Sequence, residues 1–273
     1  MTTISLSLAI IILYLITWAL ITLRVRVSID PTNQTVVPSK SHIHNIAWLF
    51  ALILHIVLLH LPLMLGKPLA LSLFSLGSYV MWFISLVLFI TALKRKVDSL
   101  AIFILPIVII SLILPLIFDS STGIFINMKS GLGVHVLMSL LAYSFLMLAS
   151  FQALLLSAQN NRLHTHQSTG FFRTLPSLED MEHLLFRFII IGVILLSIAL
   201  LTGFYYLENL FGQRVAHKTI LSILSWVIFS SLLFGRWKYG WRGKKAVHWT
   251  LAGFIVLMVA FFGTKLIQEF ILK

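Results

Sequence analysis

Histidine is the residue type in this chain whose placement could support metal chemistry, because several of the ten histidines lie in or beside long apolar runs. His135 lies near the start of the run Gly131–Gln159, and His217 directly precedes another run. His55 lies inside an earlier run, where a buried imidazole is costly enough to suggest a function. Two such histidines could supply the axial nitrogens of a haem iron. On spacing alone, a haem iron, a zinc ion and no ligand at all remain open.

Small and weakly polar side chains share one side of the helix predicted for Gly131–Gln159. They recur at spacings of three and four residues, which places them on one helix face. The stripe consists of His135, Ser139, Ala142, Leu146, Ala149, Ser150, Ala153 and Ser157. Small residues are favoured where membrane helices pack together, whereas lipid contact does not require them. The pattern therefore predicts that this face, including His135, lies inside a helix bundle.

The composition is that of an integral membrane protein. Of the 273 residues, 59% are hydrophobic and 10% are charged, and the mean hydropathy is +1.03. Eight apolar runs are long enough to cross a bilayer, which needs roughly 20 residues per helix. The sequence predicts an all-α, polytopic membrane helix bundle of about eight transmembrane helices, forming one integral membrane domain over residues 1–273. The runs are Ile4–Leu23, Asn45–Leu65, Leu69–Leu93, Leu100–Phe118, Gly131–Gln159, Phe186–Leu207, Lys218–Gly235 and Ala246–Phe270.

The basic residues predict the orientation of this bundle. If the amino terminus is outside, fourteen of the twenty lysine and arginine residues fall on the cytoplasmic side, as the positive-inside rule requires. Both termini are then outside, His135 and His217 lie at the outer face, and His55 lies near mid-membrane. Basic cytoplasmic loops also explain the net charge of +12, so we expect no nucleic-acid binding. The fourteen are Arg24, Arg26, Lys40, Lys94, Arg95, Lys96, Arg162, Arg173, Arg187, Arg236, Lys238, Arg242, Lys244 and Lys245.

No motif in the sequence points to an enzyme. There is no cysteine, and no nucleophile–base pair, phosphate-binding loop or metal-ligand run is visible. The pair His42 and His44 lies in a polar loop, where solvated side chains are favoured over metal ligands. Four tryptophans near the cytoplasmic ends of the last two spans are typical of an interfacial belt. These are Trp226, Trp237, Trp241 and Trp249.

Three stretches of the chain resemble segments of the cytochrome c assembly proteins of the CcsA, ResC and CcmC type. They read VHVLMSLLAYSFLMLASFQALLL, LPSLEDMEHLLFRFIIIGVILLSIALLTGFYY and GWRGKKAVHWTLAGFIVLMVAFFG, and they cover about Gly131–Gly263. LILHIVLLH, around His55, is a weaker match. With about eight spans and no large outer domain, the chain is most similar to the short YpjD/HemX-like branch. The resemblance places a family core at about residues 45–270, with 4–23 as an extra first span.

This resemblance implies a haem-handling protein of the bacterial inner membrane that assists cytochrome c biogenesis. The implied cofactor is a b-type, non-covalent haem near the outer face. The implied partners are the lipid bilayer, haem, and other cytochrome c assembly proteins or an apocytochrome. Carried over by position, His135 matches an outer haem-ligating histidine, and His55 matches a histidine inside the membrane.

The segment before the seventh span departs from the family pattern. Where the family has a tryptophan-rich segment ending WSWDPKETW, this chain has YYLENLFGQRVAHKTIL, and only the lysine remains, as Lys218. His217 stands where the family has a proline. We therefore expect His135 and His217 to form a substitute axial pair for haem iron, with an aromatic wall made by Tyr205, Tyr206 and Phe211. The alternatives are that His217 only caps a basic helix start and that the four tryptophans form a rebuilt platform.

Two other classes of function remain as rivals. One is a protein associated with transport of a cation or another solute, which would need carboxylates near the middle of the membrane. The acidic residues fall in loops or near span ends, which disfavours that reading. The other is an assembly scaffold that binds no haem, for which His135 would have no specific role.

Overall fold

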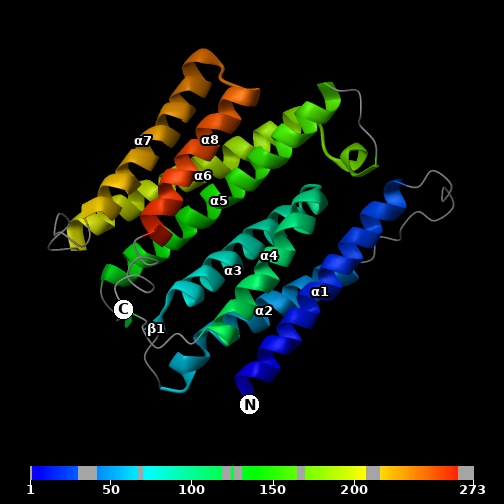
Figure 1. Ribbon diagram of the computed structural model, residues 1–273, viewed down its shortest axis with the longest axis vertical. Helices are drawn as coiled ribbons and strands as arrows, with labels where there is room; N and C mark the ends of the chain where they lie inside the picture. The colour runs from blue at the N-terminus through cyan, green and yellow to red at the C-terminus, as the bar shows by residue number, and fades with distance from the viewer. Residues whose placement is uncertain are drawn as a thin grey trace. The chain divides into compact units, whose positions relative to one another are not determined.

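The structure is a computed structural model that describes residues 2–29, 42–66, 70–118, 124–125, 131–164, 170–206 and 216–263. These residues form eight long helices (Figure 1). The helices are α1 (Thr2–Ile29), α2 (Ile43–Met64), α3 (Leu73–Ala92), α4 (Asp98–Ile117), α5 (Gly131–His164), α6 (Leu178–Tyr206), α7 (Ala216–Tyr239) and α8 (Gly243–Met258). A π-helical turn, η3 (Val259–Gly263), continues α8, and a short 3₁₀ helix, η2 (Gly170–Thr174), precedes α6. Two-residue strands β1 (Ala70–Leu71) and β2 (Ile124–Phe125) pair antiparallel.

All eight helices are long and apolar enough to cross a membrane, with candidate spans of 20 to 31 residues. The predicted all-α bundle of about eight spans is therefore confirmed. A helix suits the bilayer because it satisfies its own backbone N–H and C=O groups where no water is present. Helix α5 continues five residues past its predicted run, from Gln159 to His164, and α6 begins at Leu178, ahead of the apolar run Phe186–Leu207. Residues 264–270 of the last predicted run lie outside the described residues.

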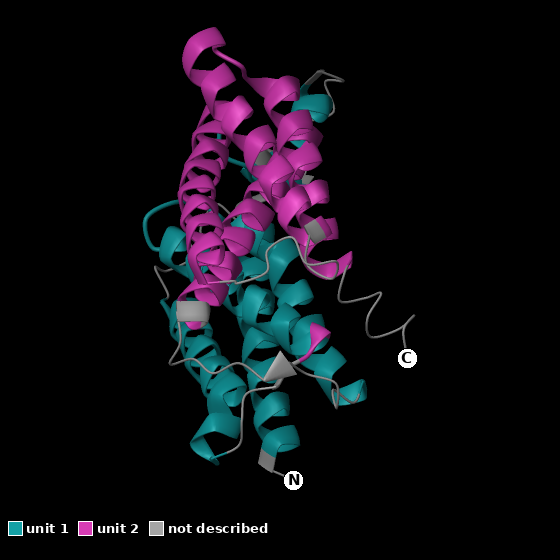
Figure 2. Cartoon of the chain, turned by 90° about the vertical axis from the view of Figure 1, so that its left-hand side faces the viewer, with its two compact units in different colours: residues 1–69, 74–121, 159–177 teal, residues 70–73, 122–158, 178–273 magenta. Residues whose placement is uncertain are grey.

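The chain divides into two compact units (Figure 2). Unit 1 consists of Met1–Leu69, Phe74–Ser121 and Gln159–Ser177, and unit 2 consists of Ala70–Leu73, Thr122–Ala158 and Leu178–Lys273. In unit 1, α1 packs against α2 and α4. The indole Nε1 of Trp18 donates to the Ile102 carbonyl of α4 at 3.0 Å, and Trp82 of α3 donates to the Leu52 carbonyl of α2 at 2.9 Å. Interhelical hydrogen bonds thus join the apolar helices of this unit.

Unit 2 contains the close packing that positions His135. Helices α7 and α8 run side by side, joined by a tight turn (Figure 1). Ser225 of α7 donates to the Gly253 carbonyl of α8 at 2.9 Å, and a Cβ added at Gly253 would lie 2.8 Å from the Phe229 ring. Trp226 donates to Ser197 Oγ of α6 at 2.8 Å. Small residues therefore let these helices approach closely enough for polar side chains to bond between them.

Candidate functional site

His135 projects from the start of α5 onto α6. Its Nδ1 lies 2.8 Å from the carbonyl oxygen of Ala199, and the side chain is half-buried. A carbonyl oxygen can only accept, so Nδ1 carries the proton and donates it. In the neutral imidazole, Nε2 then holds the free lone pair, which is the arrangement that metal-ligating histidines adopt. The prediction that His135 faces a neighbouring helix is confirmed.

Gly203 provides the space that the imidazole occupies against α6. A Cβ added at this position would lie 2.8 Å from Cε1 and 2.9 Å from Nδ1 of His135. Such contacts are shorter than real Cβ atoms make, so a larger residue would displace the ring. Ala199 and Gly203 are four residues apart and therefore share a face of α6. One face of α6 thus provides both the hydrogen-bond acceptor and the room for the ring.

The predicted stripe of small residues on α5 is mostly buried, as expected. Ala142, Leu146, Ala149 and Ala153 have no exposed surface, and Ser150 is 4% exposed. Close packing continues below the histidine, where a Cβ added at Gly192 of α6 would lie 2.6 Å from Leu146. The stripe is therefore a helix contact that also fixes the direction of His135.

Lys218 is the charged neighbour of His135. It lies in the first turn of α7, and its charge acts on the imidazole. Its Nζ lies 5.4 Å from the centroid of the Phe261 ring. A cation in the first turn of a helix is disfavoured by the positive end of the helix dipole. Neither salt bridge found in the described part of the chain involves this lysine, so an anionic group would be stabilised beside it.

Four aromatic rings cluster close to this lysine. The Tyr143 ring lies 4.9 Å from Phe261, 5.4 Å from Phe254 and 5.5 Å from Phe262, measured between centroids. Tyr143 belongs to α5, and the other three belong to α8 and η3. The π-helical turn adds a residue to each turn and so brings the adjacent Phe261 and Phe262 toward the same tyrosine. The result is an apolar cluster of stacked and tilted rings, with Lys218 beside Phe261.

His217 and the predicted aromatic wall are arranged differently from this cluster. His217 is exposed, whereas the following residue, Lys218, interacts with His135. Tyr205 and Tyr206 are 81% and 49% exposed, with ring centroids 4.9 Å apart. Phe211 lies outside the described residues. The axial pair of His135 and His217 stays a prediction, and the aromatic cluster around Tyr143 contacts Lys218 through Phe261.

His55 is fully buried in unit 1, and both of its ring nitrogens have polar partners. Nδ1 lies 3.3 Å from the hydroxyl oxygen of Tyr14, and Nε2 lies 3.0 Å from Oγ of Ser78. These contacts join α1, α2 and α3. A bond from His55 to iron would require one of the two hydrogen bonds to break. Its role as a haem ligand stays a prediction.

The pair His42 and His44 lies at the start of α2. A hollow of about 240 Å³ is lined by Arg24, His42, His44, Asn45, Trp48, Ala92, Leu93 and Asp98. Nε2 of His44 lies 3.4 Å from the Arg24 guanidinium. Among the described residues, no group of three histidine, aspartate or glutamate side chains is placed to hold a metal ion. The hollow therefore shows no metal-binding arrangement among the described residues, and the prediction that these histidines are not metal ligands stays a prediction.

Comparison with known proteins gives a consistent result over most of the chain. A family model described as Cytochrome C assembly protein matches residues 43–272. Inner membrane protein YpjD of Escherichia coli (strain K12) is 32% identical over 201 residues, which is 74% of this chain and 76% of that protein. Helix α1 lies outside the region that the family model matches.

More distant relatives share a smaller part of the chain. Protein HemX of Brevibacillus brevis is 24% identical over 131 residues, covering 47% of this chain and 48% of that protein. Cytochrome c biogenesis protein CcsA of Prochlorococcus marinus (strain NATL1A) is 28% identical over 116 residues, covering 42% and 36%. No solved structure matches the chain significantly.

Proposed function

The chain belongs to the cytochrome C assembly protein family, and we propose that it binds haem in the membrane and assists the biogenesis of cytochrome c. Membership supports a haem-related role in assembly, and the resemblance of the three sequence segments to this family is confirmed. The chain is a multi-pass membrane protein with eight candidate spans, and its relative YpjD is an inner membrane protein. We place the chain in the bacterial inner membrane with both termini outside.

The observation that carries the haem proposal is the hydrogen bond between Nδ1 of His135 and the Ala199 carbonyl. This bond fixes the tautomer and the ring orientation, and leaves Nε2 as the atom that binds iron. The energetic cost of holding an imidazole in a membrane helix is offset when it has such a partner and a ligand. His135 is therefore the proposed axial ligand, and among the metals that a neutral imidazole binds, membership of the cytochrome C assembly family favours haem iron.

The surroundings of His135 fit the rest of the haem group. Haem is a flat apolar ring that carries two carboxylates, so it needs an aromatic or aliphatic surface and a cation. The half-buried rings of Phe254, Phe261 and Phe262 supply the first, and Lys218 supplies the second. In the orientation predicted by the positive-inside rule, this site opens to the outer face, where an apocytochrome would receive the haem.

The second axial ligand is a separate part of the proposal. His217 stands one residue before Lys218 at the start of α7 and is the proposed second ligand. A bis-histidine site gives sharp α and β bands in the reduced spectrum, whereas a single histidine gives a five-coordinate spectrum with broad bands. His217→Ala should convert the first spectrum into the second without removing the haem. His55→Ala should change the spectrum only if the Tyr14 and Ser78 hydrogen bonds give way to iron.

The first experiment is an absorption spectrum of the detergent-purified protein, with pyridine haemochrome quantitation against protein. We expect a Soret band and close to one haem per chain, and His135→Ala should reduce the haem content at least tenfold while the protein still inserts. The matched control is His248→Ala. His248 is exposed, and its Nδ1 bonds to the Lys244 carbonyl of its own helix at 2.6 Å.

Three outcomes would count against the proposal in different ways. Normal haem content in His135→Ala would remove that residue as the ligand. Equal losses in His135→Ala and His248→Ala would indicate a general folding effect. A colourless wild-type protein that takes up no added haem would favour the scaffold or solute-transport alternatives.

The assembly role needs a separate test in cells whose only copy of the protein carries His135→Ala. The measurement is the amount of cytochrome c with covalently attached haem in those cells.

A further inference from the structure

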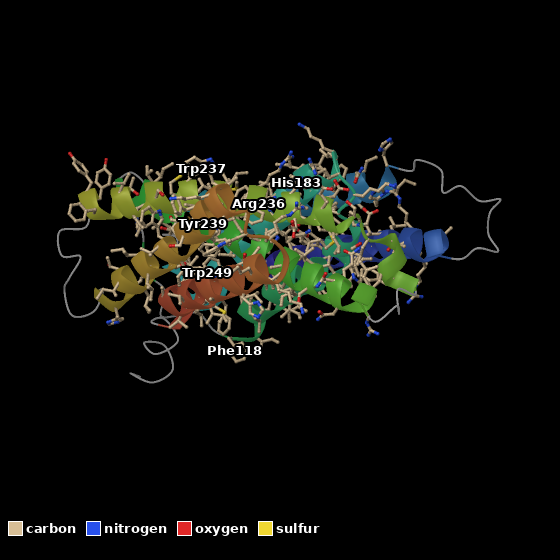
Figure 3. All side chains as sticks on the ribbon, turned by 90° about the horizontal axis from the view of Figure 1, so that it is seen from above. Phe118, His183, Arg236, Trp237, Tyr239 and Trp249 are labelled. Atoms are coloured by element: carbon tan, nitrogen blue, oxygen red, sulfur yellow. The ribbon has the colours of Figure 1, made fainter. Side chains whose placement is uncertain are left out.

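The turn between α7 and α8 concentrates positive charge. We define the basic turn as residues 234–249, the end of α7, the short connection and the first part of α8. Its cations are Arg236, Lys238, Arg242, Lys244 and Lys245. Five aromatic residues lie in the same segment: Phe234, Trp237, Tyr239, Trp241 and Trp249, of which Trp237, Tyr239 and Trp249 are labelled together with Arg236 in Figure 3. This density of cations and rings is independent of the haem site.

The cations rest on aromatic rings. Nζ of Lys245 lies 4.8 Å from the centroid of Trp241, and the Arg236 guanidinium lies 4.7 Å from that of Phe186. Nζ of Lys238 lies 5.6 Å from Phe234 and 5.7 Å from Tyr239. A ring face attracts a cation but does not neutralise its charge. These side chains are therefore held in place with their charge still available to a ligand.

The carboxylate of Glu182 stabilises the conformation of the basic turn. Glu182 of α6 accepts hydrogen bonds from Arg242 Nε at 2.8 Å and from the Gly243 amide at 2.7 Å. The bond from Glu182 raises the pKa of the Arg242 guanidinium, with a smaller contribution from the charge of Glu179. Gly243 has a φ of +56°, which glycine adopts without strain. In the described part of the chain, this is the only salt bridge of the turn, so the turn keeps a positive net charge.

The turn lies where two membrane spans end and begin. The candidate spans end at Tyr239 and restart at Gly243, which places the turn at the level of the lipid headgroups. Trp237 is 83% exposed and Tyr239 is 63% exposed. Exposed tryptophan and tyrosine rings at this level insert between lipids, and long basic side chains reach for the phosphates.

We propose that the basic turn is a binding site for an anionic phospholipid, with the headgroup phosphate held by Lys238, Lys244 and Lys245. Charge complementarity selects the anionic headgroup, and the exposed rings of Trp237 and Tyr239 provide contact for the acyl chains. A soluble acidic peptide would satisfy the lysines but would leave these two rings without an apolar partner. The site depends on neither the orientation of the chain nor the binding of haem.

The test uses the full chain, purified in maltoside detergent, with native mass spectrometry to measure bound phosphatidylglycerol and phosphatidylcholine. A lysine at a charged lipid surface contributes about fivefold in affinity, so replacing three should reduce phosphatidylglycerol affinity on the order of 100-fold. The variant is Lys238→Gln/Lys244→Gln/Lys245→Gln. The matched control, Lys94→Gln/Arg95→Gln/Lys96→Gln, removes the same charge from the α3–α4 turn, and none of its three cations rests on an aromatic ring within the described chain.

The proposal requires wild-type protein to prefer phosphatidylglycerol over phosphatidylcholine, and requires the control variant to keep that preference. Equal losses in the two variants would overturn it, because net charge alone would then explain the binding. If millimolar inorganic phosphate displaced phosphatidylglycerol and the protein showed no preference between the two lipids, the basic turn would be a general anion-binding site and not a phospholipid site. The variant Lys238→Arg/Lys244→Arg/Lys245→Arg guards against misfolding: it keeps the charge and should keep the binding.

Discussion

Replacing Gly203 with alanine tests whether the position of the His135 ring controls haem binding. The substitution adds one methyl group on α6, at the point where α6 meets the imidazole. In an ordinary helix interior, glycine to alanine stabilises the helix by about 1 kcal/mol. Here the added Cβ would lie 2.8 Å from Cε1 of His135. Any loss of haem would therefore come from displacement of the ring and not from a weakened helix.

The expected size of the effect follows from these distances. Carbon atoms approach to about 3.5 Å at the closest favourable contact, so the ring must move away from α6 by roughly 0.7 Å. The hydrogen bond from Nδ1 to the Ala199 carbonyl, now 2.8 Å, would lengthen to about 3.5 Å. That is beyond the range of about 2.7–3.2 Å for such bonds. Loss of this kind of supporting hydrogen bond weakens metal affinity about 10- to 100-fold.

The assay is a haem titration of the purified protein, followed by the Soret band. Gly203→Ala should raise the Kd for haem at least tenfold, with the haem content as purified falling in parallel. Gly77→Ala is the matched control, because a Cβ at that helical glycine would meet nothing within 4 Å. An unchanged Kd in Gly203→Ala, with haem still lost in His135→Ala, would refute the argument that the Ala199 contact orients the ligand.

Two further predictions concern stability, measured by unfolding in mixed micelles containing SDS. Tyr14→Phe should lower the free energy of unfolding by about 1 kcal/mol, because it removes the buried hydrogen-bond partner of His55 Nδ1 and with it a link between α1 and α2. An unchanged free energy of unfolding would mean that this hydrogen bond does not stabilise the protein. Glu182→Ala should lower the free energy of unfolding by about 1–3 kcal/mol, because the hydrogen bonds from Arg242 and Gly243 are both lost. Glu182→Gln should lower it less, because the glutamine amide oxygen still accepts a hydrogen bond from one of the two donors. Equal costs for Ala and Gln would contradict the assigned roles.

The parts of the fold that the sequence predicted depend on one dominant effect. Crossing the hydrocarbon layer requires about 20 apolar residues in a helix, so the number and approximate limits of the spans are visible in composition. The inward direction of His135 was also predictable, because small residues at helical spacing mark a packing face. Both inferences need only one segment of sequence at a time.

The contacts between helices were not predictable in the same way. Whether His135 meets Ala199 depends on the rotation and depth of α5 and α6 together, and a sequence separation of 64 residues carries no such information. The same holds for Tyr14 and His55, which are 41 residues apart. Gly203 gave a weak signal, since a glycine inside a membrane helix often marks close packing, but nothing in the sequence named its partner.

The neighbours His217 and Lys218 show a further limit. Adjacent residues on a helix point about 100° apart, so the direction of each side chain depends on how the helix is rotated. The sequence predicted His217 as a ligand because imidazole binds iron, and it did not indicate that the charge of Lys218 would act on His135. The rotation of α7 sets both directions, and the residues that lead into α7, 207–215, lie outside the described chain.

The residues of the proposed haem site bear on whether haem would be a transported cargo or a permanently bound cofactor. A fixed cofactor is favoured by two strong axial bonds, whereas a carrier benefits when few bonds must break before the haem leaves. The hydrogen bond to Ala199 leaves Nε2 of His135 for the proposed bond to iron, whereas the proposed contact between Lys218 and a haem carboxylate is one of charge, which weakens as salt increases. Reduced spectra of a single-histidine type, with haem released faster at high salt, would indicate a carrier. A bis-histidine spectrum that depends on His217 and is insensitive to salt would indicate a fixed cofactor.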